Sequence, residues 1–354
     1  MTEHDSLLAE NVQRILSAPT SEADFQSSKW PSPLWRELSN SGMAGVGTPE
    51  ALGGSGGSLS DVSTLTFEVG RHAAMVPLVE TMFAHWLSSK AQWMWSGGAE
   101  TVAVATPGVL DVRENGTGLR VEGTVRDVPW ARCAERVLLI VESAEGSMLI
   151  ALHADEFNAT TNENLASEPR DSVTVDIHQL SRDQWRYSPV SPSEVCARGG
   201  LLRSIAMAGA MVSILELTVS YACQREQFGR PLDRFQAVQQ ILARLASEVV
   251  ASVTAARTAS EALETREATV EVLAASVRVA QGATAVARLA HQVHGAMGIT
   301  HEYPLHKFTN RLWSWRDEFG GENERCREIV EYIRGHGGPL QLWSLLTNNF
   351  EVQS

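Results

Sequence analysis

Hydrophobic residues recur every three or four positions through much of the first quarter of the chain. The apolar residues that carry this spacing are Leu7, Leu8, Val12, Ile15, Leu16, Phe67, Val69, Ala73 and Ala74. A repeat of this kind places apolar side chains on one face of a helix. We therefore expect helices from residue 6 to about residue 90, interrupted by a glycine-rich turn at 53–57.

Short strand-like runs replace this pattern in the middle of the chain. Apolar residues there alternate with small or polar ones, or form brief apolar runs between polar positions. The runs lie at 102–104, 119–121, 137–141, 148–152 and 173–177. They predict a β domain of about 100 residues, which is an ordinary size for such a unit.

Helical spacing returns from about Cys196. The apolar residues that show it first are Leu201, Ile205, Ala208, Val212, Leu215 and Val219. Residues 235–265 and 268–292 are rich in Ala, Leu, Val, Glu and Arg and contain no proline, so they predict two long helices. Their small side chains allow close helix packing, either within the chain or against another subunit.

These patterns predict an α+β protein of three domains. We place an N-terminal helical domain at 1–95, a middle β domain at 96–195 and a C-terminal helical bundle at 196–354. A chain of 354 residues is long enough for two or three domains with sizeable cores.

Charge and cysteine usage narrow the functional classes. Twenty-nine Lys and Arg against 42 Asp and Glu give a net charge of −13, which disfavours binding to nucleic acids or anionic membranes. The four cysteines lack metal-ligand spacing and are too few for a disulfide scaffold, so we expect no metal site and a reducing compartment. Without a leader sequence or an apolar run of spanning length, we expect a cytoplasmic protein with no membrane segment.

The segment from Tyr221 to Gln236 holds the strongest chemical signal. It leads from one expected helix through a Gly-Pro corner into the next. Arg225 and Phe228 are three residues apart and are expected to share one face of the helix end. An arginine there can bind two oxygens of a pyrophosphate, and the aromatic ring can stack on a base. The alternative interpretation is a polar helix corner without a ligand.

The motif Arg225-Glu-Gln-Phe-Gly, followed by Gln236, resembles the flavin-pyrophosphate signature of the acyl-CoA dehydrogenase family. Residues 292–304 resemble the second flavin loop of that family, and residues 35–57 resemble its N-terminal turn. The resemblance implies an N-terminal helical domain, a middle β-barrel or sandwich domain, a C-terminal four-helix bundle and FAD as cofactor. The residues it assigns to cofactor binding, on the flavin of a neighbouring subunit, are Arg225, Phe228, Gln236, Gln292 and Gly295.

The resemblance also implies a reaction, the α,β-desaturation of an acyl-CoA or an acyl-carrier thioester. A carboxylate removes the α-proton while the β-hydride passes to the flavin. Electrons then leave to an electron-transfer flavoprotein or a similar acceptor. The chain is similar to the smaller subunits of heteromeric bacterial acyl-CoA dehydrogenases, so we expect a homo- or hetero-oligomer with a chain of this family.

Two departures from the family pattern concern the flavin ring and the catalytic base. Residues 102–108 lack the family's ring-binding segment, and Pro129 stands where a hydroxyl is common. Counting from Pro304 to the expected glutamate reaches Phe319, whereas Glu318 lies one residue early. One residue turns a helical side chain by about 100°. Glu318 is therefore the candidate base, although an offset one.

Several residues near this loop have two interpretations. Trp313, Trp315 and Phe319 either line an acyl pocket or seal the end of the bundle. Glu318 either acts as the base or joins Asp317, Arg311 and Arg316 in a solvated ion-pair cluster. Arg198 and Arg203 either bind a phosphate of coenzyme A or are simply exposed to solvent.

Two functions rival the dehydrogenase. One is a non-catalytic partner that shares FAD or serves only assembly, and the other is a flavin monooxygenase or nonredox acyl-processing enzyme on the same scaffold. Retention of the Arg225 motif disfavours the reduced-flavin monooxygenases, which usually lack it.

Overall fold

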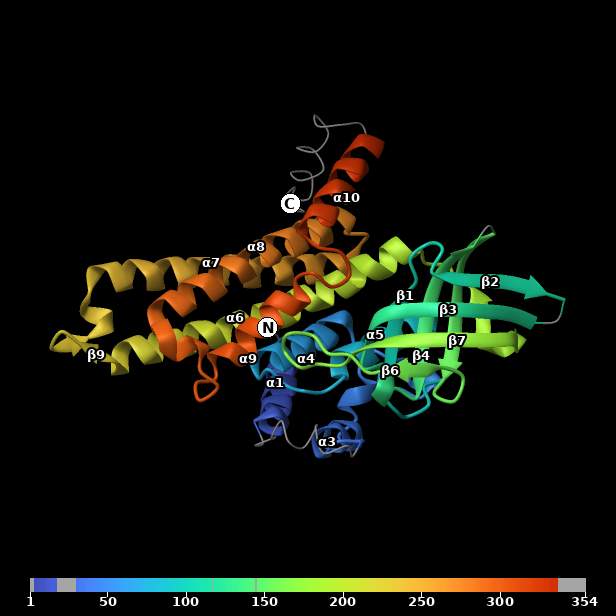
Figure 1. Ribbon diagram of the computed structural model, residues 1–354, viewed down its shortest axis with the longest axis horizontal. Coiled ribbons are helices and arrows are strands. Elements are labelled where there is room, and N and C mark those ends of the chain that lie inside the picture. Colours follow the sequence, from blue (N-terminus) through green and yellow to red (C-terminus); the bar gives the residue numbers. More distant parts are fainter. Residues whose placement is uncertain (1–2, 18–29, 117, 144, 337–354) are drawn as a thin grey trace.

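The computed structural model describes residues 3–17, 30–116, 118–143 and 145–336. The helices at the start of the chain lie beneath a long helical bundle, and the strands lie at one end of the molecule (Figure 1). These first helices are α1 (Glu3–Leu16), α3 (Pro33–Asn40), α4 (Leu59–Arg71) and α5 (Leu78–Lys90). Ser58 begins α4 through a capping box with Asp61, which satisfies backbone donors at the helix start.

The middle of the chain forms two four-stranded sheets. One has the order β1-β4-β5-β8 and the other β2-β3-β7-β6. Apolar residues of both sheets form a common core between them, as in a β-sandwich. The bounds are β1 (Glu100–Val104), β2 (Leu110–Asn115), β3 (Gly118–Pro129), β4 (Arg136–Ser143), β5 (Gly146–His153), β6 (Asn158–Thr160), β7 (Arg170–Leu180) and β8 (Trp185–Tyr187).

Every strand run expected from the sequence lies within one of these strands, but β2, β6 and β8 were not anticipated. β2 pairs only with β3, at the edge of its sheet, and half-buried Val112 stands between the exposed residues Asp111 and Arg113. A charged edge strand carries a weak apolar signal, and β6 and β8 are only three residues long.

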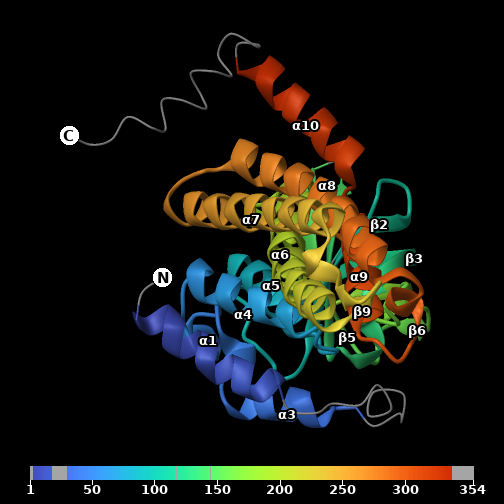
Figure 2. The same ribbon diagram turned by 90° about the vertical axis from the view of Figure 1, so that its left-hand side faces the viewer.

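The second half of the chain is a helical bundle. Its helices are α6 (Pro192–Gln224), α7 (Gln236–Thr265), α8 (Thr269–His294), α9 (Leu305–Trp315) and α10 (Glu322–Gly335). The two long helices expected at 235–265 and 268–292 are α7 and α8, with bounds within two residues of those expected. Figure 2 shows the N-terminal helices on one side of α6, with α7 and α8 on the other.

Glycines bring α4 and α6 into close contact. A Cβ atom at Gly70 would lie 1.8 Å from the carbonyl oxygen of Ala206, and one at Gly209 would lie 2.0 Å from that of Phe67. Only glycine fits at either position without moving the facing backbone. The N-terminal helices are therefore joined to the bundle by direct contact of two backbones.

Two helical segments among the described residues are long and apolar enough to cross a membrane by length and composition alone. They are Pro192–Gln224 and Thr269–Ile299. More than half of the apolar window in each segment is buried inside the protein. Their apolar residues form the core of the bundle, which accounts for their composition.

Candidate functional site

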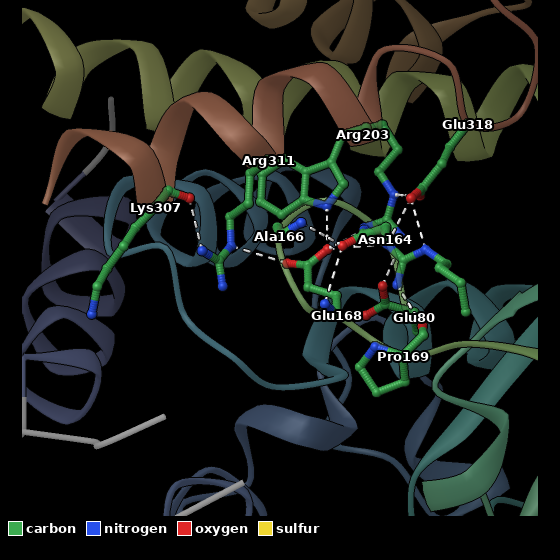
Figure 3. Close-up of polar contacts among 11 residues, drawn as sticks. Glu80, Asn164, Ala166, Glu168, Pro169, Arg203, Lys307, Arg311 and Glu318 are labelled. Atoms are coloured by element: carbon green, nitrogen blue, oxygen red, sulfur yellow. Dashed lines mark hydrogen bonds and ion pairs between the residues drawn. The ribbon is translucent and has the colours of Figure 1, made fainter. Parts of the chain in front are cut away.

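Six charged side chains form one continuous chain of ion pairs where the N-terminal helices, the β domain and the bundle meet (Figure 3). We call this set the buried ion chain. Its members, in order of contact, are Glu80, Arg203, Glu318, Arg170, Glu168 and Arg311. Three carboxylates alternate with three guanidinium groups, and this balance of charge is what allows them to be buried together.

Glu168 lies at the centre of hydrogen bonding in this chain. Its carboxylate accepts bonds from Arg311 Nε at 3.0 Å and Trp315 Nε1 at 2.7 Å, and also from Arg170 and Asn164. Burial raises the pKa of Glu168, but the guanidinium groups of Arg311, Arg170 and Arg203 outweigh it, so the net pKa is lowered. The carboxylate therefore stays ionised although it is buried.

Glu318 is held by two arginines, one at each carboxylate oxygen. Arg203 Nε lies 2.6 Å from Oε2, and Arg170 Nη2 lies 2.6 Å from Oε1. The expected ion pairs of Glu318 with Arg311 and Arg316 are wrong, because Arg311 pairs with Glu168 and Arg316 with Asp317. A general base needs a carboxylate oxygen that can approach the substrate proton. This geometry disfavours Glu318 as the base, and its catalytic role stays a prediction.

Arg203 joins α6 to α5 within the buried ion chain. Its Nη2 atom lies 2.6 Å from Glu80 Oε1, and its side chain is only 4% exposed. Burial lowers the pKa of Arg203, but the charges of Glu318 and Glu80 raise it by more than burial lowers it. The net shift of the pKa is therefore upward. Arg203 is already paired twice, so it is not available for a coenzyme A phosphate, and its expected exposure to solvent is wrong.

Phe319 fills the position that the count from Pro304 assigns to the base. Its backbone is left-handed, with φ of 56°, and its ring packs edge-on against Phe83 at 5.5 Å. A Cβ atom at Gly199 would lie 2.7 Å from this ring. The remaining cavity beside Phe319 is about 10 Å³, which is close to the minimum for one water. No acyl chain fits there in this conformation.

Phe319 also lines a much larger cleft, of about 900 Å³. Residues 102–107 and 125–129 of the β domain line one wall, and Trp313 and residues 317–320 line another. The cleft is within the size range of cofactor sites. Residues 102–107 and Pro129, which depart from the family pattern, therefore line this cleft, and binding of a flavin ring there stays a prediction.

The three aromatic residues expected near an acyl pocket have different surroundings. Trp313 lines the large cleft and stacks on His291 at 5.8 Å. Trp315 is 3% exposed and donates to Glu168, so it seals the interior. Phe319 lines both the cleft and the small cavity. The three residues therefore do not form a single pocket.

The Arg225 motif is a β-hairpin and not a helix end, which corrects one expectation. Helix α6 ends at Gln224, and β9 (Glu226–Gln227) pairs with β10 (Arg230–Pro231). Phe228 and Gly229 form the turn with φ of 55° and 80°, as a type I′ turn requires. Arg225 and Phe228 thus share no helix face. The Phe228 side chain is 92% exposed at the hairpin tip.

Two expected flavin segments converge at this end of the bundle. The ring of Tyr221 stacks on His294 at 4.4 Å, and its hydroxyl donates to the carbonyl of His294. This contact brings the end of α6 beside the end of α8. The exposed residues assigned to cofactor binding at these helix ends and in the adjoining hairpin are Arg225, Phe228, Gln236, Gln292 and Gly295. Their contact with a cofactor remains a prediction.

The hairpin and the strands of the β domain lie at opposite ends of α6 (Figure 1). Cys196 lines the cleft near the start of α6, and Gln224 ends the helix at the hairpin. The 28 helical steps between them span about 42 Å at 1.5 Å per residue. An FAD molecule is shorter than this span, so one flavin cannot contact both the cleft wall at Cys196 and the hairpin within a single chain.

Two models of known protein domains match the N-terminal and C-terminal parts of the chain. The C-terminal domain of acyl-CoA dehydrogenase matches residues 197–332, and its N-terminal domain matches residues 2–92. Together these matches cover more than half of the chain. The chain belongs to the acyl-CoA dehydrogenase family. Enzymes of this family are FAD-dependent oxidoreductases that act on CH–CH bonds of acyl-CoA thioesters.

Individual acyl-CoA dehydrogenases resemble the chain over most of its length. Acyl-CoA dehydrogenase FadE27 of Mycobacterium tuberculosis is 28% identical over 338 residues, covering 87% of this chain and 90% of that protein. The crystal structure of the ChsE4-ChsE5 complex from the same organism contains a chain with a TM-score of 0.85 and 24% identity, covering 96% and 99%. The Tcur3481-Tcur3483 steroid acyl-CoA dehydrogenase, a G363A variant, gives a TM-score of 0.82 at 24% identity, covering 94% and 98%.

Proposed function

We propose that this chain is one subunit of a larger FAD-dependent acyl-CoA dehydrogenase, and that it shares a flavin with a longer chain of the same family. The observation that carries the proposal is the separation of its two flavin-facing regions along α6. A flavin that uses the hairpin must find the rest of its site on a neighbouring chain. The assembly is therefore part of the site.

The hairpin of this chain suits the pyrophosphate of such a shared flavin. Arg225 is exposed beside the ends of α6 and α8, and no carboxylate lies within ion-pair distance of it among the described residues. A guanidinium can donate two parallel hydrogen bonds to phosphate oxygens. Phe228, turned outward at the hairpin tip, offers an aromatic face for a base.

The reaction would take place where the partner supplies a carboxylate. Once bound, FAD supplies the acceptor for the β-hydride of the acyl thioester. In this chain, Phe319 fills the position counted for the base, and Glu318 is held by Arg170 and Arg203. Phe319 leaves no room for substrate at the position counted for the base, and the carboxylate of Glu318 is not free to act there. The partner is the expected source of the base.

Two of the similar structures agree with a heteromeric assembly. The ChsE4-ChsE5 structure is by its name a complex, and the Tcur3481-Tcur3483 protein also pairs two names and is called a steroid acyl-CoA dehydrogenase. We infer an acyl-CoA substrate, an electron-transfer flavoprotein or similar acceptor, and a cytoplasmic location for this chain. A bulky acyl group is the class we favour.

Co-expression tests this proposal directly. The chain expressed alone should bind little FAD, and the chain expressed with a longer homologue should copurify with it and carry FAD, measured by absorbance per complex. Acyl-CoA should reduce the flavin of the complex. A homo-oligomer of this chain that is fully loaded with FAD and active by itself would contradict the proposal.

A further inference from the structure

Arg198 differs from every other arginine with a buried or half-buried side chain in the described part of the protein. All the others pair with a carboxylate. Arg198 is half-buried on α6 and has no carboxylate or hydrogen-bond acceptor within bonding distance among the described residues. A desolvated charge is costly unless it is paired. The missing counter-ion is the observation that needs an explanation.

Arg198 lines a cavity of about 60 Å³ between the N-terminal helices and α6. This is several times the space that one water requires, about 10–15 Å³. Its walls are mostly apolar and include Met82, Phe83 and Leu202. A small ligand with a short apolar part fits such a cavity better than a strongly hydrated ion does.

Three positively charged features lie at or near this cavity. The Arg198 guanidinium stacks on the Trp86 ring at 4.5 Å, and the Lys90 ammonium lies 5.7 Å from the same ring. The start of α4, at Ser58 and Leu59, also lines the cavity, and a helix start carries partial positive charge. Two carboxylates lie on the adjoining helices. Glu194 precedes Arg198 on α6, and Asp61 is bonded to Ser58.

We propose that the cavity between Arg198 and Trp86 is a binding site for a small carboxylate that carries a short apolar group, of about the size of propionate. The carboxylate pairs with the Arg198 guanidinium, and the apolar part packs between Met82 and Leu202. Burial lowers the pKa of Arg198 to about 10, so the guanidinium stays charged at neutral pH. The site is separate from the hairpin and does not rest on the shared flavin.

This carboxylate can reach the cavity in two forms. It is either a free small acid from solvent or the far end of an acyl chain that carries a second carboxylate. Phe83 and Leu202 line both this cavity and the small one beside Phe319. An acyl chain from the large cleft would therefore have to displace Phe319 and Phe83 to arrive at Arg198.

Ligand-dependent melting of the purified full chain, or of its complex with the partner, tests the site. Propionate should raise the melting temperature, and propionamide, which has the same shape without the charge, should not. Arg198→Met keeps an unbranched apolar side chain at this position but removes the charge, and it should weaken propionate binding at least tenfold by calorimetry. Arg198→Lys should retain part of the binding.

Arg186→Met is the matched control, because Arg186 also lies over a tryptophan, at 5.9 Å from Trp93, but is exposed. It should respond to propionate like the wild type. Equal responses to propionate and propionamide, an unchanged response in Arg198→Met, or tighter binding of inorganic phosphate than of propionate would each overturn the proposal. The first and last comparisons need only the wild-type protein.

The two forms of the ligand are distinguished with coenzyme A thioesters. Glutaryl-CoA, whose acyl chain ends in a carboxylate, is compared with pentanoyl-CoA in the Phe319→Ala variant. Tighter binding of glutaryl-CoA that disappears when Arg198→Met is added supports the end of an acyl chain. Binding of free propionate with no such gain supports a small acid from solvent. If neither probe depends on Arg198, the site does not exist.

Discussion

The ring of Phe319 lies directly over the Cα of Gly199, where a methyl group would come within 2.7 Å of it. This contact links the loop before α10 to the start of α6. Phe319 also adopts φ of 56°, a conformation that costs a non-glycine residue free energy and persists only when its surroundings hold it. Gly199 provides the space that makes this conformation possible.

Gly199→Ala should therefore displace Phe319 and lower the free energy of unfolding by about 1–3 kcal/mol. Gly200→Ala is the control, because its methyl would meet Ser276 Oγ at 3.5 Å and Arg325 Nε at 3.9 Å, which are ordinary contact distances. That change should be neutral or stabilising, since alanine favours a helix by about 0.5–1 kcal/mol over glycine. Urea unfolding of both variants measures the difference. Adding Phe319→Ala to Gly199→Ala should remove most of the loss, and a loss that stays the same would show that the ring is not the cause.

Arg225→Ala should weaken FAD binding in the complex by about 1.5–3 kcal/mol, the usual contribution of hydrogen bonds to charged groups. Titration of the apo complex with FAD measures this. Arg113→Ala, which changes an exposed arginine on β2 at the other end of the molecule, should leave the affinity unchanged. Equal affinities for Arg225→Ala and wild type would remove the hairpin from the cofactor site.

Glu318→Gln should reduce stability but not the rate of flavin reduction. Removing one partner of a buried ion pair costs about 3–5 kcal/mol in general, and the 17% exposure of Glu318 places the expected loss below that range. Loss of a general base would instead slow reduction by about 10²–10⁴. Stopped-flow reduction by acyl-CoA separates the two outcomes. Asp317→Asn changes the adjacent exposed acid and should alter neither quantity. A large rate loss in Glu318→Gln alone would make this chain the catalytic one.

His85 should make the protein sensitive to acid. It is 1% exposed, and neither ring nitrogen has a hydrogen-bond partner among the described residues. Burial together with nearby Arg136 lowers its pKa to about 3. In the unfolded state the His85 ring binds a proton near pH 6.5, whereas in the folded state it stays neutral down to about pH 3. The free energy of unfolding therefore falls as the pH drops from about 6.5 towards 3. The expected slope is about 1.4 kcal/mol per pH unit for this group. Urea unfolding of His85→Leu between pH 7 and 4.5 should show a smaller loss than wild type. The exposed His153→Leu should behave like wild type, and equal slopes in all three proteins would refute the assignment.

The long helices could be predicted closely, because α7 and α8 are proline-free and rich in strong helix formers. The hairpin could not. Gly229 and Pro231 have the composition of a helix boundary, and nothing in the identity of Phe228 indicates the positive φ that it adopts. A two-residue turn in which only one residue is glycine gives a weak local signal.

The pairing within the buried ion chain could not be predicted from the sequence either. Glu318 pairs with Arg170 and Arg203, which lie 148 and 115 residues earlier. Spacing predicts contacts within a helix, but pairing across domains depends on the tertiary fold. One signal was present, since Glu80 and Arg203 interrupt apolar helical runs and so were candidates for a buried pair.

The glycine contact between α4 and α6 makes this seam intolerant of sequence change. At Gly70 and Gly209 the obstruction is a facing carbonyl group rather than a movable side chain, so no repacking of neighbours can accommodate even one added methyl group. Any larger residue at either position would therefore force α4 and α6 apart. In the evolution of this chain, Gly70 and Gly209 can change only together with the angle at which the N-terminal helices meet the bundle.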